Sequence, residues 1–378
     1  MSRDVIRDLT DDEARVALPL KWGAVPVGTV PAWVAEMDIA LAPAIADAVS
    51  DAVRAGTAGY PPYGDAGVGE ALAGFAGRHW DQDLPPDAAV VVGDVIAGIR
   101  IVLDVLCPPG PVVVPLPCYP PFRDVVRLAG RELIPVTTDP DSDDASLDLT
   151  AVEDAFRAGG RTLLLCNPHN PLGRVARRAE LEQLRDLAAG YGVRVVADEI
   201  HGPLALPGVA FTPYLTVDPG AVLVTSASKA FNTAGLHCAQ VVTLSRGEQA
   251  RLRGLPGPQN HAYSPLGMIA AAVAWRDCDA WLASLVRRLD DQRELLGTLL
   301  PDHLPKARMR PLEATYLAWL DLRAYGADEP AVDALAHGVR VAPGGDYQPD
   351  LRGHVRLNVA TTPERTTLAV QRLSAAVA

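Results

Sequence analysis

Three short polar segments in the middle of the chain carry side chains that could do chemistry together. They contain Asn170, Asp198 and Lys229, and Ser226 and Ser228 stand just before the lysine. Each segment directly follows a strand-sized apolar run, at residues 163–166, 193–197 and 222–224. Ligands of an open α/β sheet bind at the carboxyl ends of its strands, so we expect the three segments to line one crevice.

An amine, a carboxylate and an amide at one crevice are the groups that pyridoxal 5'-phosphate (PLP) requires. Lysine holds this cofactor as a Schiff base and, once a substrate amine displaces it, becomes the base that moves the Cα proton. A carboxylate such as Asp198 keeps the pyridine nitrogen protonated, so that the ring can accept electrons. The amide of Asn170 can donate to the phenolate oxygen, and hydroxyls near Lys229 can hold the phosphate. The sequence therefore predicts a PLP enzyme that acts on a small-molecule amino acid, with Lys229 as its catalytic residue.

The apolar runs also predict a sheet that helices cover on both faces. The runs are residues 89–92, 112–116, 162–166, 193–197 and 222–225. They are rich in Val and Leu and do not alternate with polar residues, which is typical of strands buried on both faces. Between two of them, leucines recur at helical spacing within residues 180–189. Alternating strand and helix signals predict an α/β fold.

The C-terminal part has a different pattern, which predicts a smaller α+β domain. The expected elements are a long charged helix from about Trp275, a strand at 315–322, a helix at 331–337, a strand at 354–359 and a last helix to Ala378. The N-terminal segment to about Asp38 has too little periodicity to stand alone. We therefore expect a large domain of residues 40–274, and a small domain that combines residues 1–39 with residues 275–378.

The composition of the 378 residues argues against several classes of protein. A net charge of -12 disfavours a nucleic-acid or anionic-membrane partner, because both need basic patches. We expect no signal peptide, and no apolar stretch approaches the roughly 20 residues of a spanning helix. Five scattered cysteines without a Cys-x-x-Cys pair argue against a zinc ribbon or a disulfide framework. A cytoplasmic location is expected.

Motifs for other ligands find no support in the sequence. Neither G-x-G-x-x-G nor G-x-x-x-x-G-K-[ST] occurs, so dinucleotide and P-loop chemistry are not expected. Residues 139–144 superficially resemble a calcium loop, but Asp144 stands where Gly is required and Thr150 where a bidentate Glu is required. We expect a solvated acidic loop there, and no metal site.

Several segments resemble a known enzyme family. Residues 170–173, 198–201 and 226–229 resemble the signature of the fold-type I aminotransferase class I/II superfamily of PLP enzymes. Residues 33–38, 198–201, 228–236, 313–319 and 355–360 resemble its MalY/PatB branch, the cystathionine β-lyase-like C–S lyases. The resemblance runs from about Lys21 to the C-terminus. It implies a large domain with a mostly parallel seven-stranded sheet and a smaller α+β C-terminal domain.

The resemblance implies a role for each matching residue around the cofactor ring. Lys229 would form the Schiff base, Asp198 would pair with the pyridine nitrogen, and Asn170 would donate to the phenolate oxygen. His201 stands where many relatives have Tyr, close to that same oxygen, and Tyr119 would stack on the ring face.

The resemblance also implies a phosphate site made of main-chain and hydroxyl donors. The amides of Val95 and Ile96 would begin the helix after residues 93–94, and a helix N-terminus favours a phosphate through its free N–H groups and its dipole. Ser226 and Ser228 would add their hydroxyls.

Two further residues would act at the edge of the site. Arg356 would bind the α-carboxylate of the substrate bidentately. Tyr60 would reach the phosphate of the neighbouring subunit, which implies a homodimer with shared active sites. The chain departs from the family at Ile39, where Phe is usual, and at His237, near the place of a phosphate-binding Arg. These departures leave the cofactor core intact and the substrate open.

The leading hypothesis for function is β-elimination on cystathionine or another cysteine S-conjugate. An aminotransferase is the alternative, because both reactions begin with removal of the Cα proton by the freed Lys229. A regulatory or binding protein on the same scaffold is a third hypothesis, from another class. The intact set of Lys229, Asp198 and Asn170 argues against this third reading.

Overall fold

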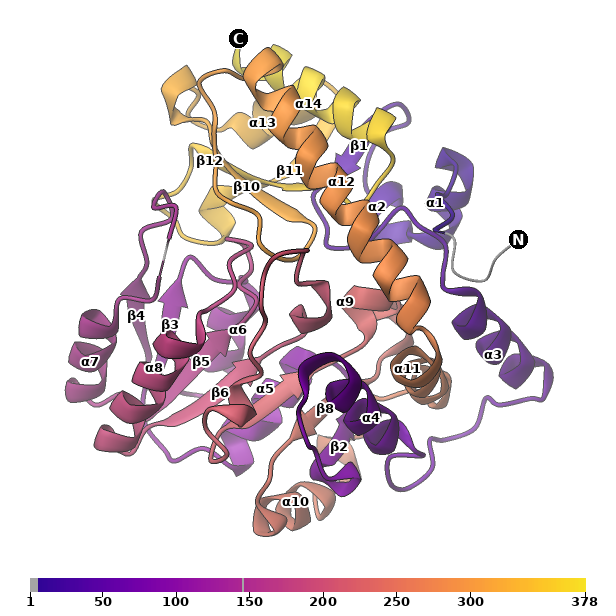
Figure 1. The fold of residues 1–378 in the computed structure, drawn as a ribbon, viewed down its shortest axis with the longest axis vertical. Coiled ribbons are helices and arrows are strands. Elements are labelled where there is room, and N and C mark those ends of the chain that lie inside the picture. The colour runs from indigo at the N-terminus through magenta and orange to yellow at the C-terminus, as the bar shows by residue number, and fades with distance from the viewer. Residues whose placement is uncertain (1–5, 145) are drawn as a thin grey trace.

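A seven-stranded sheet forms the centre of the large domain. The computed structural model describes residues 6–144 and 146–378, and this sheet lies in the lower half of Figure 1. In sheet order its strands are β2 (Ala89–Val92), β8 (Ala239–Val242), β7 (Val222–Thr225), β6 (Arg194–Asp198), β5 (Thr162–Cys166), β3 (Val112–Leu116) and β4 (Leu133–Thr137). Strand β8 is antiparallel to both neighbours, and the pairs from β7 to β4 are parallel. The expected mostly parallel seven-stranded sheet is confirmed.

Helices cover both faces of this sheet, which explains why its strands are apolar throughout. Successive side chains of a strand point to opposite faces. Leu163 and Leu165 of β5 join the core that contains α8 and α11, whereas Leu164 joins the core that contains α5. The helices around the sheet are α4 (Val68–Trp80), α5 (Val95–Val105), α6 (Pro121–Leu128), α7 (Leu149–Arg157), α8 (Arg178–Tyr191), α10 (Arg246–Arg253) and α11 (Pro265–Asp277).

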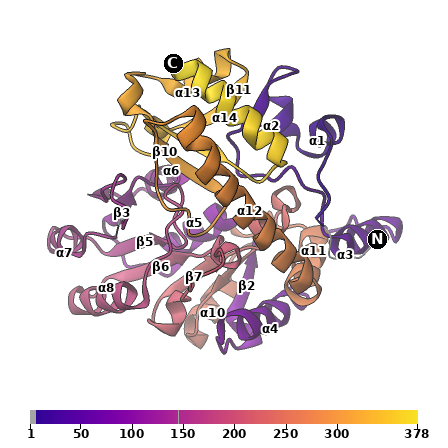
Figure 2. The ribbon, with the colours of Figure 1, turned by 45° about the horizontal axis from the view of Figure 1, so that its top comes forward.

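A second sheet combines the C-terminal part with one strand from the N-terminal segment. In sheet order its strands are β1 (Val30–Ala32), β11 (Val339–Pro343), β12 (His354–Asn358), β10 (Leu317–Asp321) and β9 (Arg308–Met309). Strand β1 is parallel to β11, and the other pairs are antiparallel. The accompanying helices are α12 (Asp279–His303), α13 (Pro330–Ala336) and α14 (Pro363–Val377), and α12 descends from this sheet towards α11 (Figure 2). The pairing of β1 with β11 supports the division into residues 40–274 and residues 1–39 with 275–378, which we retain as a proposal.

Two expected element bounds in the C-terminal part were wrong. Trp275 belongs to α11, and the long charged helix α12 starts only at Asp279. Strand β10 starts at Leu317 and not at Thr315, because Thr315 has a φ of 72°, in the left-handed region that a strand cannot use. The Oγ1 of Thr315 accepts a hydrogen bond from the Leu317 amide at 3.1 Å, which holds this turn before the strand.

A buried ion pair fixes the N-terminal segment, which contains α1 (Asp11–Ala17) and α2 (Pro19–Gly23) and is followed by α3 (Pro43–Arg54). The Nζ of Lys21 lies 2.9 Å from Oδ1 of Asp38, and both side chains are essentially inaccessible to solvent. The indole N–H of Trp22 donates to the same carboxylate oxygen at 2.7 Å. The Asp38 amide donates to the carbonyl of Ala360, just beyond β12. The pair therefore links the N-terminal segment to the small domain.

We expect Asp38→Ala to lower the free energy of unfolding by about 3–5 kcal/mol, because it leaves the ammonium of Lys21 buried without its partner. Urea unfolding of both proteins would measure this difference. Asp51→Ala is the matched control, because it breaks the exposed pair of Asp51 with Arg54 and should cost no more than about 1 kcal/mol. Equal effects of the two substitutions would contradict the prediction.

Residues 139–144 form an acidic loop as expected, with Asp139, Asp143 and Asp144 exposed, but Asp141 is half-buried, so the loop is not solvated throughout. These residues, here called the acidic strap, connect the large domain to side chains of the small domain. The carboxylate of Asp141 binds His354 and Arg323, and the backbone carbonyl of Asp144 accepts from Arg310. Basic partners distant in sequence, which the local charge pattern does not reveal, explain the difference.

No helix within residues 6–144 and 146–378 is long and apolar enough to cross a bilayer. All five cysteines are free and buried, so packing accounts for their place in the fold.

Candidate active site

The three polar segments of the sequence meet at one edge of the large sheet. Strands β5, β6 and β7 are parallel neighbours, so their carboxyl ends lie side by side. Asp198 is the last residue of β6 and pairs with Cys166 of β5 and Val224 of β7. Lys229 lies on the short helix α9 (Ser228–Phe231), which follows β7. The fold thus places Asn170, Asp198 and Lys229 around one edge.

The amine of Lys229 points towards the N-terminal segment. Its Nζ donates to the carbonyl oxygen of Ala35 at 3.1 Å, and the hydroxyl of Tyr316 donates to the same oxygen at 3.0 Å. Burial lowers the pKa of Lys229, and the nearby cation of Arg356 lowers it further. An amine with a lowered pKa is more readily neutral, which a nucleophile or a base requires.

Asp198 is buried, and no cationic side chain among the described residues is in contact with it. Its Oδ1 accepts from the Ile200 amide at 3.0 Å, and its burial raises the pKa of this carboxyl to about 7, against the opposing effects of that hydrogen bond and of Lys229. Such a carboxyl is stabilised as an anion if a cation binds beside it. A protonated pyridine nitrogen is a cation of this kind, so the residue fits PLP.

His201 also has a ring nitrogen that could bind the cofactor. The side chain is buried, and its Nδ1 has no hydrogen-bond partner among the described residues. Burial lowers the pKa of His201 to about 3, and the charges of Lys229, Arg356 and His169 act in the same direction. The imidazole is therefore neutral and offers one free ring nitrogen to an oxygen of a ligand.

Arg356 connects the small domain to Asn170. It lies on β12, where its Nη1 donates to Oδ1 of Asn170 at 2.9 Å and its Nη2 to the carbonyl of Trp33 at 2.6 Å. Its Nε has no partner among the described residues, and its guanidinium lies over the ring of Tyr347, 5.1 Å from the centroid. The expected bidentate contact with a carboxylate would replace bonds that Arg356 makes here to the protein itself.

The residues expected around the phosphate lie at the starts of two helices. Val95 and Ile96 are the first residues of α5, and Asp94 caps this helix by accepting from the Ala97 amide at 2.8 Å. This cap leaves the amides of Val95 and Ile96 at the open end of the helix, as a phosphate site requires.

The two serines before the lysine differ in their surroundings. The hydroxyl of Ser226 is buried, donates to the carbonyl of Cys238 at 2.8 Å and accepts from the Ser228 amide at 3.1 Å. Ser226 therefore shapes the turn before α9, and Ser228, which is half-buried, is the more available hydroxyl.

The two tyrosines of the expected site differ in exposure. Tyr119 is half-buried and packs edge-on against Phe122. Burial raises the pKa of Tyr119, and the charges of Asp198 and Asp94 raise it further, against the opposing charge of Arg356. Tyr60 lies on the loop between α3 and α4, is 88% exposed, and has its ring 5.6 Å from that of His261.

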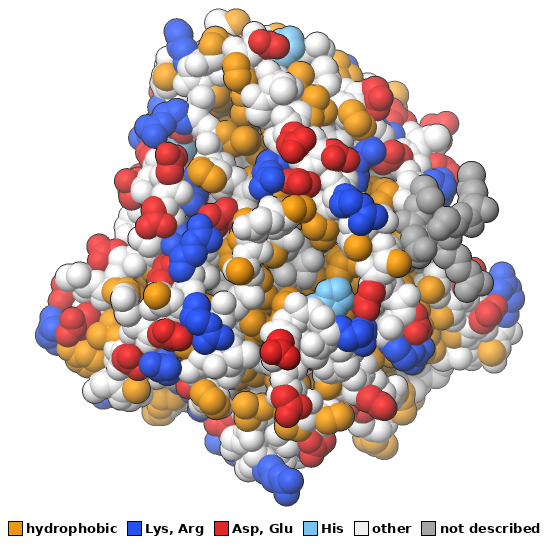
Figure 3. All heavy atoms as spheres, in the orientation of Figure 1, with side chains coloured by type: hydrophobic (Ala, Val, Ile, Leu, Met, Phe, Trp, Pro, Cys, Tyr) orange, Lys and Arg blue, Asp and Glu red, His pale blue; other side chains and the backbone are white. Residues whose placement is uncertain are grey.

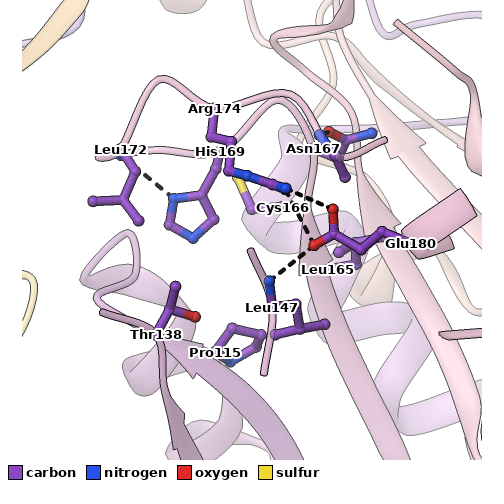
Figure 4. Close-up of a pocket in the computed structure, with 11 residues that line it drawn as sticks. Pro115, Thr138, Leu147, Leu165, Cys166, Asn167, His169, Leu172, Arg174 and Glu180 are labelled. Atoms are coloured by element: carbon purple, nitrogen blue, oxygen red, sulfur yellow. Dashed lines mark hydrogen bonds and ion pairs between the residues drawn. The ribbon is translucent and has the colours of Figure 1, made fainter. Parts of the chain in front are cut away.

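A small pocket opens at the carboxyl end of β5 (Figure 4). Inside it, Arg174 pairs with Glu180 at 2.7 Å, and Nδ1 of His169 accepts from the Leu172 amide at 3.4 Å. Burial lowers the pKa of His169 to about 3, so this imidazole is neutral. The lining residues are Pro115, Thr138, Leu147, Leu165, Cys166, Asn167, His169, Leu172, Arg174, Ala176 and Glu180. The segment after β5 thus directs His169 into this pocket and Asn170 towards Arg356.

Some contacts of the site were missed by sequence reasoning. The carbonyls of Ala35 and Trp33 accept from Lys229 and Arg356, but a backbone carbonyl has no signature in a sequence. Tyr316 lies within the family-like segment 313–319 and could have been singled out there. Tyr347, under Arg356, lies in no motif.

The titration of Asp198 leads to a prediction for the cofactor-free protein. The folded pKa of about 7 lies above the value of about 3.9 in an unfolded chain, so the folded state binds more protons between these values. Relative to Asp198→Asn, wild type should therefore lose stability as the pH rises through this window, on the order of a few kcal/mol. Urea unfolding of both proteins at pH 5 and pH 8 measures the change. A difference between the two that does not vary with pH would count against this titration.

Comparison with known proteins agrees with the site. The model of the aminotransferase class I and II family matches residues 34–373. A Mycobacterium tuberculosis protein provisionally named cystathionine beta-lyase is 40% identical over 94% of this chain and 93% of its own length. Cystathionine beta-lyase PatB of Bacillus subtilis is 30% identical over 92% of each chain. The crystal structure of a Corynebacterium diphtheriae protein, provisionally described as a PLP-dependent beta-cystathionase, has a TM-score of 0.94, 33% identity and 99% coverage of both chains. The chain therefore belongs to the aminotransferase class I and II family, in the branch that contains PatB.

Proposed function

We propose that this protein is a PLP-dependent C–S β-lyase that cleaves L-cystathionine or related cysteine S-conjugates to a thiol, pyruvate and ammonia. The observation that carries the proposal is the half-buried amine of Lys229 near the buried carboxyl of Asp198, which has no cationic contact among the described residues, at the ends of neighbouring strands. The names of the relatives, cystathionine beta-lyases over nearly the whole chain, support the same reaction.

Each residue around the cofactor has a separate role in the proposed reaction. PLP, when bound, supplies a ring that takes up the electrons left behind when the Cα proton departs. Lys229 holds the cofactor and then removes that proton. The carboxylate of Asp198 keeps a proton on the pyridine nitrogen. The free Nδ1 of His201 and the NH2 group of Asn170, whose Oδ1 is already bound to Arg356, would donate to the phenolate oxygen.

Other residues hold the two ends of the bound molecules. The amides of Val95 and Ile96 would bind the phosphate with the hydroxyl of Ser228, while Ser226 supports that turn. Tyr119 would cover a face of the ring. Arg356 binds the α-carboxylate of the substrate and exchanges its protein contacts for that carboxylate.

A homodimer with shared active sites completes the proposal. Tyr60 and Tyr63 are almost fully exposed, and an apolar groove next to their loop is lined by Pro62, Pro265 and Met268 among others. A second copy of the chain would cover this groove and receive Tyr60 at its phosphate site. Light scattering should give twice the 40.0 kDa of one chain.

The free, buried cysteines support a location in the reducing cytoplasm.

Incubation with L-cystathionine, with and without a 2-oxoacid, tests the reaction. The C–S bond breaks with its electrons on sulfur, and one water molecule hydrolyses the three-carbon enamine that remains, so we expect homocysteine, pyruvate and ammonia in equal amounts without any oxoacid. Turnover only when an oxoacid is present would make the protein an aminotransferase. Binding of PLP without turnover of any amino acid would favour a regulatory protein. Figure 3 shows acidic and basic side chains interspersed over one face of the molecule. The charge pattern of this face therefore does not favour one of these three functions over the others.

A further inference from the structure

The acidic strap, residues 139–144, crosses from the large domain to the small domain. It follows β4 and rises from that edge of the large sheet towards the strands of the small one (Figure 1). The Oδ1 of Asp141 lies 2.9 Å from Nε2 of His354, which is fully buried on β12. Arg323 donates to Oδ2 of Asp141, and its guanidinium also binds Asp321 of β10 at 2.9 Å. One carboxylate thus contacts two residues of the small domain.

These contacts are better explained by ion pairing than by a bound metal. Asp141, Asp321 and His354 could offer three ligand atoms within 4.8 Å of one another. Arg323, however, already pairs with both aspartates and compensates one of their two negative charges. The strap also gives its backbone to the small domain, because Arg310 donates to the carbonyls of Asp143 and Asp144 at 3.1 and 3.3 Å.

His354 is coupled to Arg356 by strand geometry and by stacked rings. The two residues are two positions apart on β12, so their side chains leave the same face about 7 Å apart. The ring of Trp319 stacks on His354 at 5.4 Å and meets Tyr347 edge-on at 5.6 Å. Tyr347 in turn lies under the guanidinium of Arg356. A shift of His354 would therefore be passed to Arg356 through both backbone and rings.

We propose that Asp141 is a positioning residue that fixes β12 through His354 and so sets the place of Arg356 for the substrate carboxylate. This inference rests on the proposed function, in which Arg356 binds that carboxylate. Displacement of a binding group by about 1 Å can cost orders of magnitude in rate, so a contact of this kind has measurable effects.

The test measures ligand binding to the PLP-loaded enzyme by its visible absorbance. L-alanine, which has no leaving group, is compared with ethylamine, which lacks the carboxylate. For Asp141→Ala we expect the Kd of L-alanine to rise about tenfold, with that of ethylamine within about twofold of wild type. In turnover of L-cystathionine, the KM should rise in the same proportion and kcat should stay within about threefold.

Three further variants make the result decisive. Asp143→Asn is the matched control, because it removes a charge from the same strap and keeps the backbone bond to Arg310. It should leave both Kd values unchanged. Asp141→Asn keeps an acceptor for His354 and should restore most of the affinity for L-alanine. Melting temperature and PLP absorbance show whether Asp141→Ala is folded and loaded with PLP. If Asp141→Ala fails this check, Arg323→Ala replaces it in the test, because it removes the other partner of Asp141. Arg323→Ala should then raise the Kd of L-alanine.

Arg356→Gln separates the two proposals. If it raises the Kd of L-alanine and the strap variants do not, the strap proposal alone is overturned. If it leaves that Kd unchanged, Arg356 does not bind the carboxylate, and both assignments are overturned. Equal weakening of L-alanine and ethylamine by Asp141→Ala would show a general structural role and would also overturn the positioning role.

Discussion

Replacement of Lys229 by alanine is expected to lower kcat for pyruvate formation from L-cystathionine by roughly 10²–10⁴-fold or more, because the variant lacks the base that moves the Cα proton. The variant should also lose the covalent hold on PLP, so the visible absorbance of the purified protein should change. The chain has three lysines, and the surroundings of the other two differ: Lys21 is in the buried pair with Asp38, and Lys306 is exposed.

Borohydride reduction of the holoprotein, followed by peptide mapping, distinguishes the three lysines. We expect the pyridoxyl group on Lys229 only, and Lys306→Ala should retain wild-type activity as the matched control. A pyridoxyl group on another lysine, or full activity of Lys229→Ala, would remove the basis of the proposed function.

Much of the large domain could be predicted because its signals are local. A strand covered on both faces needs apolar residues throughout, so residues 162–166 and 222–225 indicate β5 and β7 without knowledge of their neighbours. Asp198 and Lys229 attract attention because a charged group at the end of such a strand must have a partner. The family resemblance gave the strand number and the reaction, which the local pattern does not contain.

Contacts between distant segments could not be predicted in this way. The bond from Lys229 to the carbonyl of Ala35 spans 194 positions, and the bond from His354 to Asp141 spans 213. Every residue has a carbonyl, and acidic residues on loops are usually solvated, so neither partner stands out in the sequence. The roles of Asn170, His201 and Arg356 remain predictions until they are tested.

Replacement of Asp198 by asparagine is expected to lower kcat by about 10²–10⁴-fold. Removal of one partner of a buried charged pair costs about 3–5 kcal/mol, and each 1.36 kcal/mol on the barrier is a factor of ten in rate. The loss should fall on kcat and not on KM, because Asp198 acts on the ring nitrogen and not on the carboxylate of the substrate.

Glu199→Gln provides the matched control for this effect. Glu199 is the adjacent buried carboxyl, whose pKa burial raises to about 8, but its Oε1 accepts from the Tyr214 amide at 2.6 Å, a bond that glutamine can keep. We therefore expect kcat of Glu199→Gln to stay within about tenfold of wild type. The two substitutions should differ because the two carboxyls differ in position. The Asp198 carboxyl lies at the strand end beside Lys229, whereas the Glu199 carboxyl points into the protein. If Asp198→Asn kept wild-type kcat while Glu199→Gln lost it, the pyridine nitrogen would have to be assigned to Glu199, and the strand register that places Asp198 at the site would no longer explain the chemistry.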